Sequence, residues 1–99
     1  MKLKWTLTAE ENLVNITDYI LGRFTKKEVN FFFLEVDRVI GIVLEYPEIG
    51  SFYNETIYRH ILISKQTYLF YKVENNTVYL VTFFNNSQDP QKLLSILYS

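Results

Sequence analysis

The stretch TYLFYKVENNTVYLVTFFNNSQDP, residues 67–90, decides the fold, because it holds two runs of β-branched and aromatic residues on either side of a short polar turn. The turn contains the pair Asn75-Asn76, and asparagine tolerates the left-handed backbone geometry that tight hairpin turns require. We therefore expect a β-hairpin with strands at residues 68–74 and 77–84. A similar run at residues 57–64 precedes it, so an antiparallel meander of three strands is predicted.

Two helices are predicted before the meander, because a capping-box pattern occurs twice. In Thr-Ala-Glu-Glu, residues 8–11, the Thr8 hydroxyl can accept from a backbone N–H while the glutamate reaches back to the cap. Thr-Lys-Lys-Glu, residues 25–28, repeats the pattern. One helix should begin at Ala9 and a second near Lys26, after a short break.

The helix ends and buried faces follow from breakers and from apolar spacing. Pro47 cannot continue a helix, so the second helix should end near Tyr46. Apolar residues three and four positions apart mark the core face of each helix. In the first helix these are Leu13, Ile16, Ile20 and Phe24, and in the second they are Val29, Phe32, Phe33, Val36, Ile40, Val43 and Leu44.

The second predicted helix also carries apolar residues on its far side. Phe31, Leu34 and Ile42 fall there, near Arg38. An apolar patch away from the core can mark a partner site. Coverage by the first helix or by a dimer mate, or scattered surface hydrophobicity, is the alternative.

These elements predict an α+β fold with a short first strand at residues 2–6, two helices on one face of a mainly antiparallel sheet, and a short C-terminal helix at residues 91–98. The order is β-α-α-β-β-β, in a single domain over residues 1–99. Period two along the third strand places Tyr68, Phe70 and Lys72 on the sheet face away from the helices, with Arg59 or His60 as neighbours. Such sheet aromatics can stack nucleobases, although more often they belong to a core or an interface.

Composition excludes several classes of site. The chain has no cysteine and one histidine, which rules out thiolate and multi-histidine metal centres, so we expect no metal or cofactor. A net charge of −1 creates no field that would attract nucleic acid. No apolar run is long enough to span a membrane, and the cytoplasm is the expected compartment. A lone histidine in an apolar strand, His60, is more often structural than catalytic, so the residues alone name no reaction.

A series of short motifs, in order along nearly the whole chain, resembles the RelE/ParE superfamily of bacterial toxins from type II toxin–antitoxin modules, which includes plasmid stabilisation proteins. The motifs are Trp5-Thr6, Ala9, Asn12-Leu13, Ile16, Tyr19-Ile20, Tyr46-Pro47, Ile49-Gly50, Tyr58-Arg59, Tyr71-Lys72-Val73, Gln88-Asp89-Pro90 and Leu93. RelE-type members cut messenger RNA in the ribosomal A site, whereas ParE-type members inhibit DNA gyrase without nuclease activity. Both are neutralised by an antitoxin, which for the second type is ParD-like.

The positions that resemble the nuclease cleft favour the ParE-like branch. The arginine that opens a strand in RelE-type toxins falls at Tyr68, and the basic loop position falls within residues 85–88, Asn-Asn-Ser-Gln. Only Arg59 remains in register with a basic position, with His60, Lys65 or Lys72 as further candidates to join it. RNA cleavage, which builds negative charge on a phosphate, is therefore disfavoured. If the chain were a nuclease, Arg59, His60 and Tyr68 would be its catalytic residues.

The resemblance implies that the chain binds a cognate antitoxin and DNA gyrase, with the ribosome a less favoured target. A homodimer, or a heterotetramer with the antitoxin, is the assembly it suggests. A member that has lost toxicity is a further alternative. The candidate residues for binding target or antitoxin are Arg59, Tyr68, Phe70, Lys72, Asn85, Gln88, Phe31, Leu34, Arg38 and Ile42.

Overall fold

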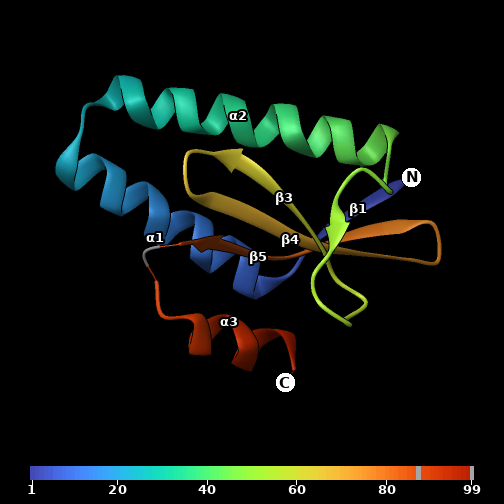
Figure 1. Cartoon of the computed structure of the whole chain (residues 1–99). Coiled ribbons are helices and arrows are strands. Elements are labelled where there is room, and N and C mark those ends of the chain that lie inside the picture. The colour runs from blue at the N-terminus through green and yellow to red at the C-terminus, as the bar shows by residue number, and fades with distance from the viewer. Residues whose placement is uncertain (87, 99) are drawn as a thin grey trace.

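A twisted sheet with helices on both faces forms the structure, a computed structural model that describes residues 1–86 and 88–98. The described elements, labelled in Figure 1, are β1 (Lys2–Trp5), α1 (Leu7–Arg23), α2 (Lys26–Glu45), β2 (Ser51–Phe52), β3 (Arg59–Ser64), β4 (Thr67–Glu74), β5 (Thr77–Asn85) and α3 (Pro90–Leu97). The strand order is β1-β5-β4-β3-β2. The predicted α+β class, with a mainly antiparallel sheet, is confirmed.

The meander of β3, β4 and β5 is antiparallel throughout, as predicted. Asn75 and Asn76 form its second turn with φ of 51° and 58°, the left-handed values expected there. Two features differ from the sequence prediction. β1 pairs with β5 in parallel, and Ser51–Phe52, for which no strand was predicted, forms a short edge strand on Arg59 and His60.

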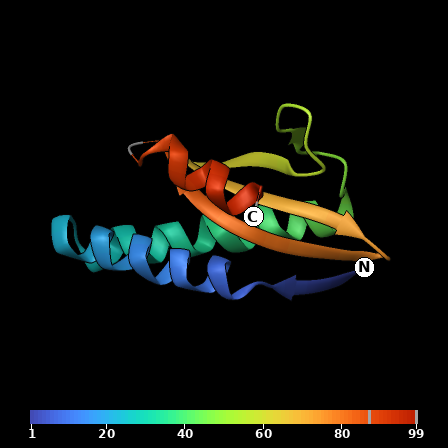
Figure 2. The same cartoon turned by 90° about the horizontal axis from the view of Figure 1, so that it is seen from below.

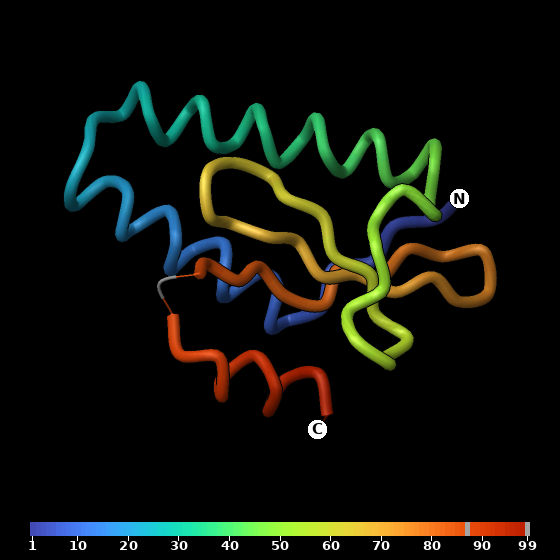
Figure 3. Tube along the Cα trace, viewed as in Figure 1, coloured from blue at the N-terminus to red at the C-terminus, as the bar shows by residue number. Residues whose placement is uncertain are grey.

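The helices divide between the two sheet faces. Figure 2 shows α1 and α2 side by side on one face and α3 on the other. The Cα trace in Figure 3 places the α1–α2 connection and the β4–β5 turn at opposite ends of the molecule. The main core lies under α1 and α2, and a second cluster of Phe70, Phe84, Leu93 and Leu97 lies under α3. Phe70 faces away from α1 and α2 as predicted, but it is buried beneath α3.

Helix α1 begins two residues earlier than predicted, at Leu7, because Thr6 and not Thr8 is its N-cap. The Thr6 hydroxyl oxygen accepts from the Ala9 N–H at 3.1 Å and lies 2.8 Å from the Leu80 carbonyl oxygen. The sheet therefore holds the cap, since the Thr6 N–H also donates to the Leu80 carbonyl. A cap fixed on both sides outweighs the local capping-box pattern two residues later.

Thr6→Ala is expected to lower the free energy of unfolding by about 0.5–2 kcal/mol, because it removes the N-cap acceptor. Thr8→Ala is the matched control, and it should change the stability by only a few tenths of a kcal/mol, roughly the effect of a substitution away from a cap. Urea unfolding of both variants measures the difference. Equal losses would show that Thr6 is not the cap.

Helix α2 begins at Lys26 as predicted and ends at Glu45, with Tyr46 as its C-cap. The Thr25 hydroxyl donates to the Glu28 carboxylate, and this bond holds the pKa of Glu28 below its ordinary value. The core faces of the helices need three corrections. Phe24 of the first helix series is 52% exposed, Phe33 is 39% exposed where burial was predicted, and Val39 is buried although it was not predicted to be.

Candidate functional site

The three residues that a nuclease would use lie on opposite faces of the sheet. Arg59 pairs with Tyr71, whereas His60 pairs with Phe70 and Leu62 with Tyr68. Because successive strand residues point to opposite faces, Arg59 lies on the face of α1 and α2, while His60 and Tyr68 lie on the face of α3. The structure therefore does not bring Arg59 together with the other two.

Arg59 is tied to the loop between α2 and β2. Its guanidinium donates to the backbone carbonyls of Glu48 and Gly50, at 3.2 and 2.8 Å. It also stands over the Phe52 ring at 3.9 Å from the centroid. These contacts show that Arg59 anchors the loop. The two carbonyls occupy guanidinium N–H groups that would otherwise be free to bind a phosphate.

His60 belongs to an aromatic cluster on the face of α3. Its ring stacks on Phe70 at 5.5 Å between centroids, and lies 5.6 Å from Tyr68 and 5.5 Å from Tyr53. Its Nδ1 is 2.9 Å from the Ser51 carbonyl oxygen. The predicted neighbourhood of His60 and Phe70 is thus confirmed, and His60 joins β2 to β3 through these contacts.

Lys72 and Arg38, two cations among the candidates, are both paired. The Lys72 Nζ lies 3.2 Å from a Glu74 carboxylate oxygen and 5.3 Å from the centroid of Tyr79. Arg38 pairs with Glu35 one helical turn earlier at 2.8 Å, which raises the pKa of Arg38 and lowers that of Glu35. Neither supplies a cation to a cleft.

The far side of α2 is exposed in part. Phe31 is 56% exposed and Leu34 67%, while Ile42 is half-buried. The three residues therefore differ in exposure, and Ile42 contributes less exposed surface to the predicted patch than Phe31 and Leu34. Phe31 lines a cavity.

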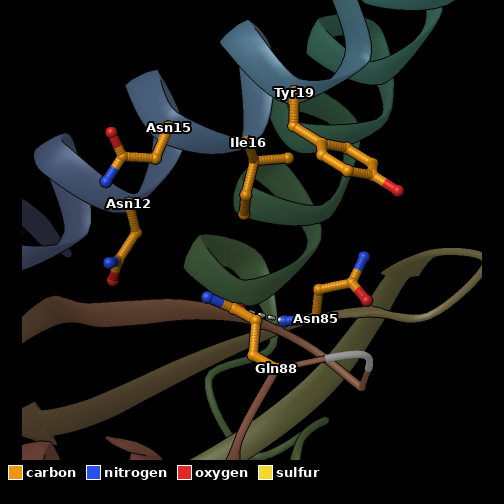
Figure 4. Close-up of a pocket in the computed structure, with 6 residues that line it drawn as sticks. All are labelled: Asn12, Asn15, Ile16, Tyr19, Asn85 and Gln88. Carbon is orange, nitrogen blue, oxygen red and sulfur yellow. Dashed lines mark hydrogen bonds between the residues drawn. The ribbon is translucent and has the colours of Figure 1, made fainter. Parts of the chain in front are cut away.

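Asn85 and Gln88 line a cavity of about 230 Å³ beside α1. The other four residues that line it, Asn12, Asn15, Ile16 and Tyr19, all come from α1. In Figure 4 the Ile16 side chain projects from α1 towards Asn85 and Gln88, with the two asparagine amides on one side and the Tyr19 ring on the other. Ser87, part of the same predicted loop position, lies outside the described residues.

A second cavity of about 290 Å³ adjoins the first, since Ile16, Tyr19 and Asn85 line both. It lies among the end of α1, the start of α2 and the β3–β4 turn, and its remaining lining residues are Ile20, Phe24, Glu28, Phe31, Phe32, Ser64, Lys65, Gln66 and Thr67. We name the two cavities together the α1 groove.

The described lining of the first cavity of the α1 groove carries no charge at neutral pH, because it consists of four amides, an isoleucine and a tyrosine. Its amides are ordered by hydrogen bonds. The backbone N–H of Asn85 donates to Gln88 Oε1 at 2.8 Å, and the side-chain NH₂ group of Asn85 donates to the Thr67 hydroxyl at 3.3 Å. The Thr82 hydroxyl donates to Asn12 Oδ1. Such a surface can hydrogen-bond a ligand, but it offers no cation to stabilise a developing charge.

Asn15 was not among the predicted site residues, while Asn12 and Tyr19 entered only as parts of the family motif. Their helical spacing could have placed them together, since residues three and four apart share one side of a helix. Which side would meet residues 85–88 depends on how α1 packs on β5, and that is tertiary information.

The described residues form neither a metal-binding cluster nor a membrane-spanning helix. Within residues 1–86 and 88–98, no cluster of three or more His, Asp or Glu side chains is arranged to hold a metal ion. No helix in the described part of the chain is long and apolar enough to cross a membrane.

Comparison with known proteins finds similarity in structure. No protein-family model matches the sequence, and no curated protein matches it. A chain of the chromosomal ParDE TA system from P. aeruginosa superposes with a TM-score of 0.73 at 14% identity, over 86% of this chain and 95% of that one. The conserved hypothetical protein HP0894 from Helicobacter pylori superposes with a TM-score of 0.58 at 15% identity, over 89% of this chain and 97% of that one. The chain therefore has the RelE/ParE-like fold that its sequence motifs predicted.

Proposed function

We propose that residues 1–99 form the toxin of a bacterial toxin–antitoxin module, which acts in the cytoplasm by binding a protein target and is neutralised by a cognate antitoxin. The fold supports the proposal, since it is shared with a chain of a ParDE TA system. DNA gyrase is the proposed target, on the resemblance to ParE-type toxins. The proposed antitoxin is ParD-like.

One observation carries the choice of a non-enzymatic mechanism: described side chains at the positions of the nuclease cations carry no charge. Tyr68 is half-buried in the aromatic cluster, and Asn85 and Gln88 present amides to the α1 groove. Arg59, the basic residue left in register, is held by loop carbonyls on the opposite face. Because losing one electrostatic donor costs about 100- to 1000-fold in rate, we expect no efficient RNA cleavage.

Induction of the chain alone in a bacterial host tests the proposal. We expect growth arrest with induction of the DNA-damage response, and we expect purified protein to block supercoiling by gyrase. Co-expression of the small reading frame next to its gene should restore growth. Unchanged supercoiling at a stoichiometric excess of protein would exclude gyrase as the target, and normal growth at a high level of folded protein would indicate a member that has lost toxicity.

A RelE-like nuclease is the second candidate, and one contact favours it. With its Nδ1 proton donated to the Ser51 carbonyl, His60 keeps Nε2 as a proton acceptor, beside Tyr68. Primer extension on translated messages after induction distinguishes the candidates. Cuts in the ribosomal A site that disappear in His60→Ala would establish the nuclease, whereas intact messages during growth arrest would exclude it.

A further inference from the structure

We propose that the α1 groove binds an extended peptide segment of a protein partner, by donating hydrogen bonds to main-chain carbonyls and by enclosing one apolar side chain. The inference deepens the proposed function and rests on it only for the identity of the partner. The binding chemistry rests on the orientation of amides in the first cavity and on the apolar walls of the second.

Two amides in the groove are left as hydrogen-bond donors. The oxygen of Asn12 accepts from the Thr82 hydroxyl, and the oxygen of Gln88 accepts from the Asn85 N–H at 2.8 Å. Each NH₂ group of Asn12 and Gln88 therefore retains its two protons, and neither has a partner among the described residues. A ligand of this cavity must supply acceptors.

The hydrogen-bond acceptors of such a ligand should be neutral. Among the described residues that line the first cavity there is no cation that would compensate a carboxylate or a phosphate. Peptide carbonyls are neutral acceptors, and they recur along an extended chain at intervals that amide donors can match. A nucleobase would need an aromatic surface, but the one aromatic ring of this lining, Tyr19, already has the Arg23 guanidinium 5.0 Å from its centroid.

The second cavity has apolar residues in its walls. They include Ile20, Phe24, Phe31 and Phe32. This part of the lining suits an apolar side chain, whereas Glu28, Lys65 and the residues next to Lys65 form a polar part of the same lining. A buried apolar anchor typically dominates the energy of a peptide complex. Lys65 also lines this cavity, and its Nζ lies 5.7 Å from the Phe24 centroid. Because Ile16, Tyr19 and Asn85 line both cavities, one residue of an extended segment can fill the second while its main chain crosses the first.

The test uses the full chain and a minimal peptide, N-acetyl-leucine N′-methylamide, observed by NMR. We expect saturable shifts of the side-chain NH₂ signals of Asn12 and Gln88 and of the Ile16 methyl signals, with a dissociation constant on the order of 1 mM, as suits a fragment. Adenosine 5′-monophosphate is the competing probe. Shifts of these signals with the nucleotide alone, or with neither probe, would overturn the inference.

Asn12→Asp and Gln88→Glu sharpen the test, because each keeps the oxygen that its partner needs and loses the NH₂ donors. Each should weaken binding of the leucine fragment by about tenfold. Asn30→Asp, an exposed amide outside the groove, adds the same charge and should leave binding unchanged. Equal affinity of all three variants would contradict a role for the amides.

The outcome is separable from that of the proposed function. Growth arrest by a chain that does not bind the leucine fragment would overturn the peptide groove alone. Fragment binding by a chain that neither arrests growth nor inhibits gyrase would overturn the proposed toxin alone.

Discussion

Replacing Gly50 with alanine is expected to lower the free energy of unfolding by about 1–3 kcal/mol, because the new Cβ has no room. That atom would lie 2.6 Å from the Tyr71 hydroxyl oxygen, 2.8 Å from its Cε1 and 3.0 Å from the His60 carbonyl oxygen. The Tyr71 hydroxyl is held in place, since it donates to the Pro47 carbonyl at 2.8 Å and accepts from the Gly50 N–H at 2.9 Å. Movement of the ring would therefore break a buried pair of hydrogen bonds.

Gly22→Ala and Gly41→Ala are the matched controls for this steric effect. Neither Cβ would meet an atom within 4 Å, and both glycines lie in helices, so each control should gain up to about 1 kcal/mol. None of the three glycines has a positive φ, which leaves contact as the cause of the difference. If denaturant unfolding shows Gly50→Ala as stable as the two controls, the loop does not pack against Tyr71 as the structure has it.

Local signals explain which parts of the fold could be predicted. The hairpin at Asn75-Asn76 and the start of α2 at Lys26 depend on residues within a few positions of one another. The parallel pairing of β1 with β5 joins residues such as Trp5 and Leu80, far apart in the sequence, and no local pattern encodes it. The error at Thr8 has the same origin, because the sheet and not the capping box selects Thr6.

The candidate site was predictable one residue at a time but not as an arrangement. The comparison with the nuclease cleft drew attention to Asn85 and Gln88, yet their grouping with Asn15 and Tyr19 depends on how α1 packs on β5. Alternation along β3 alone would have separated Arg59 from His60. Phe70 shows the limit of alternation, since period two gave its face correctly while α3 decided its burial.

The α1 groove and the sheet face beneath α3 differ in how accessible they are to a partner. The α1 groove is open, and Tyr19 and Phe31 at its edge are each more than half exposed. On the other face, α3 and the rings of His60 and Tyr53 cover Phe70, which is 2% exposed, so a partner can reach this candidate only after α3 leaves the sheet and these rings move. The stability of α3 on the sheet is therefore one condition for Phe70 to serve as a binding residue.

Replacing Leu93 with alanine is expected to destabilise α3 by about 2–5 kcal/mol, the usual cost of truncating a buried leucine. Leu93 is 3% exposed and packs with Leu97, Phe70 and Phe84 in the cluster under α3. A helix of eight residues is not stable alone, so α3 depends on this contact. We expect amide hydrogen exchange to accelerate throughout α3, while the strands and α1 keep their protection.

Leu80→Ala is the matched control, because it truncates a buried leucine in the main core instead of the cluster under α3. Leu80 is fully buried in the main core, so the same truncation there should cost a similar amount but accelerate exchange across the whole sheet and both N-terminal helices. A local response to Leu93→Ala and a global response to Leu80→Ala would show that α3 opens as a unit above an intact fold. Uniform acceleration in both variants would show that the two clusters unfold together, and Phe70 would then be inaccessible to a partner in any folded state.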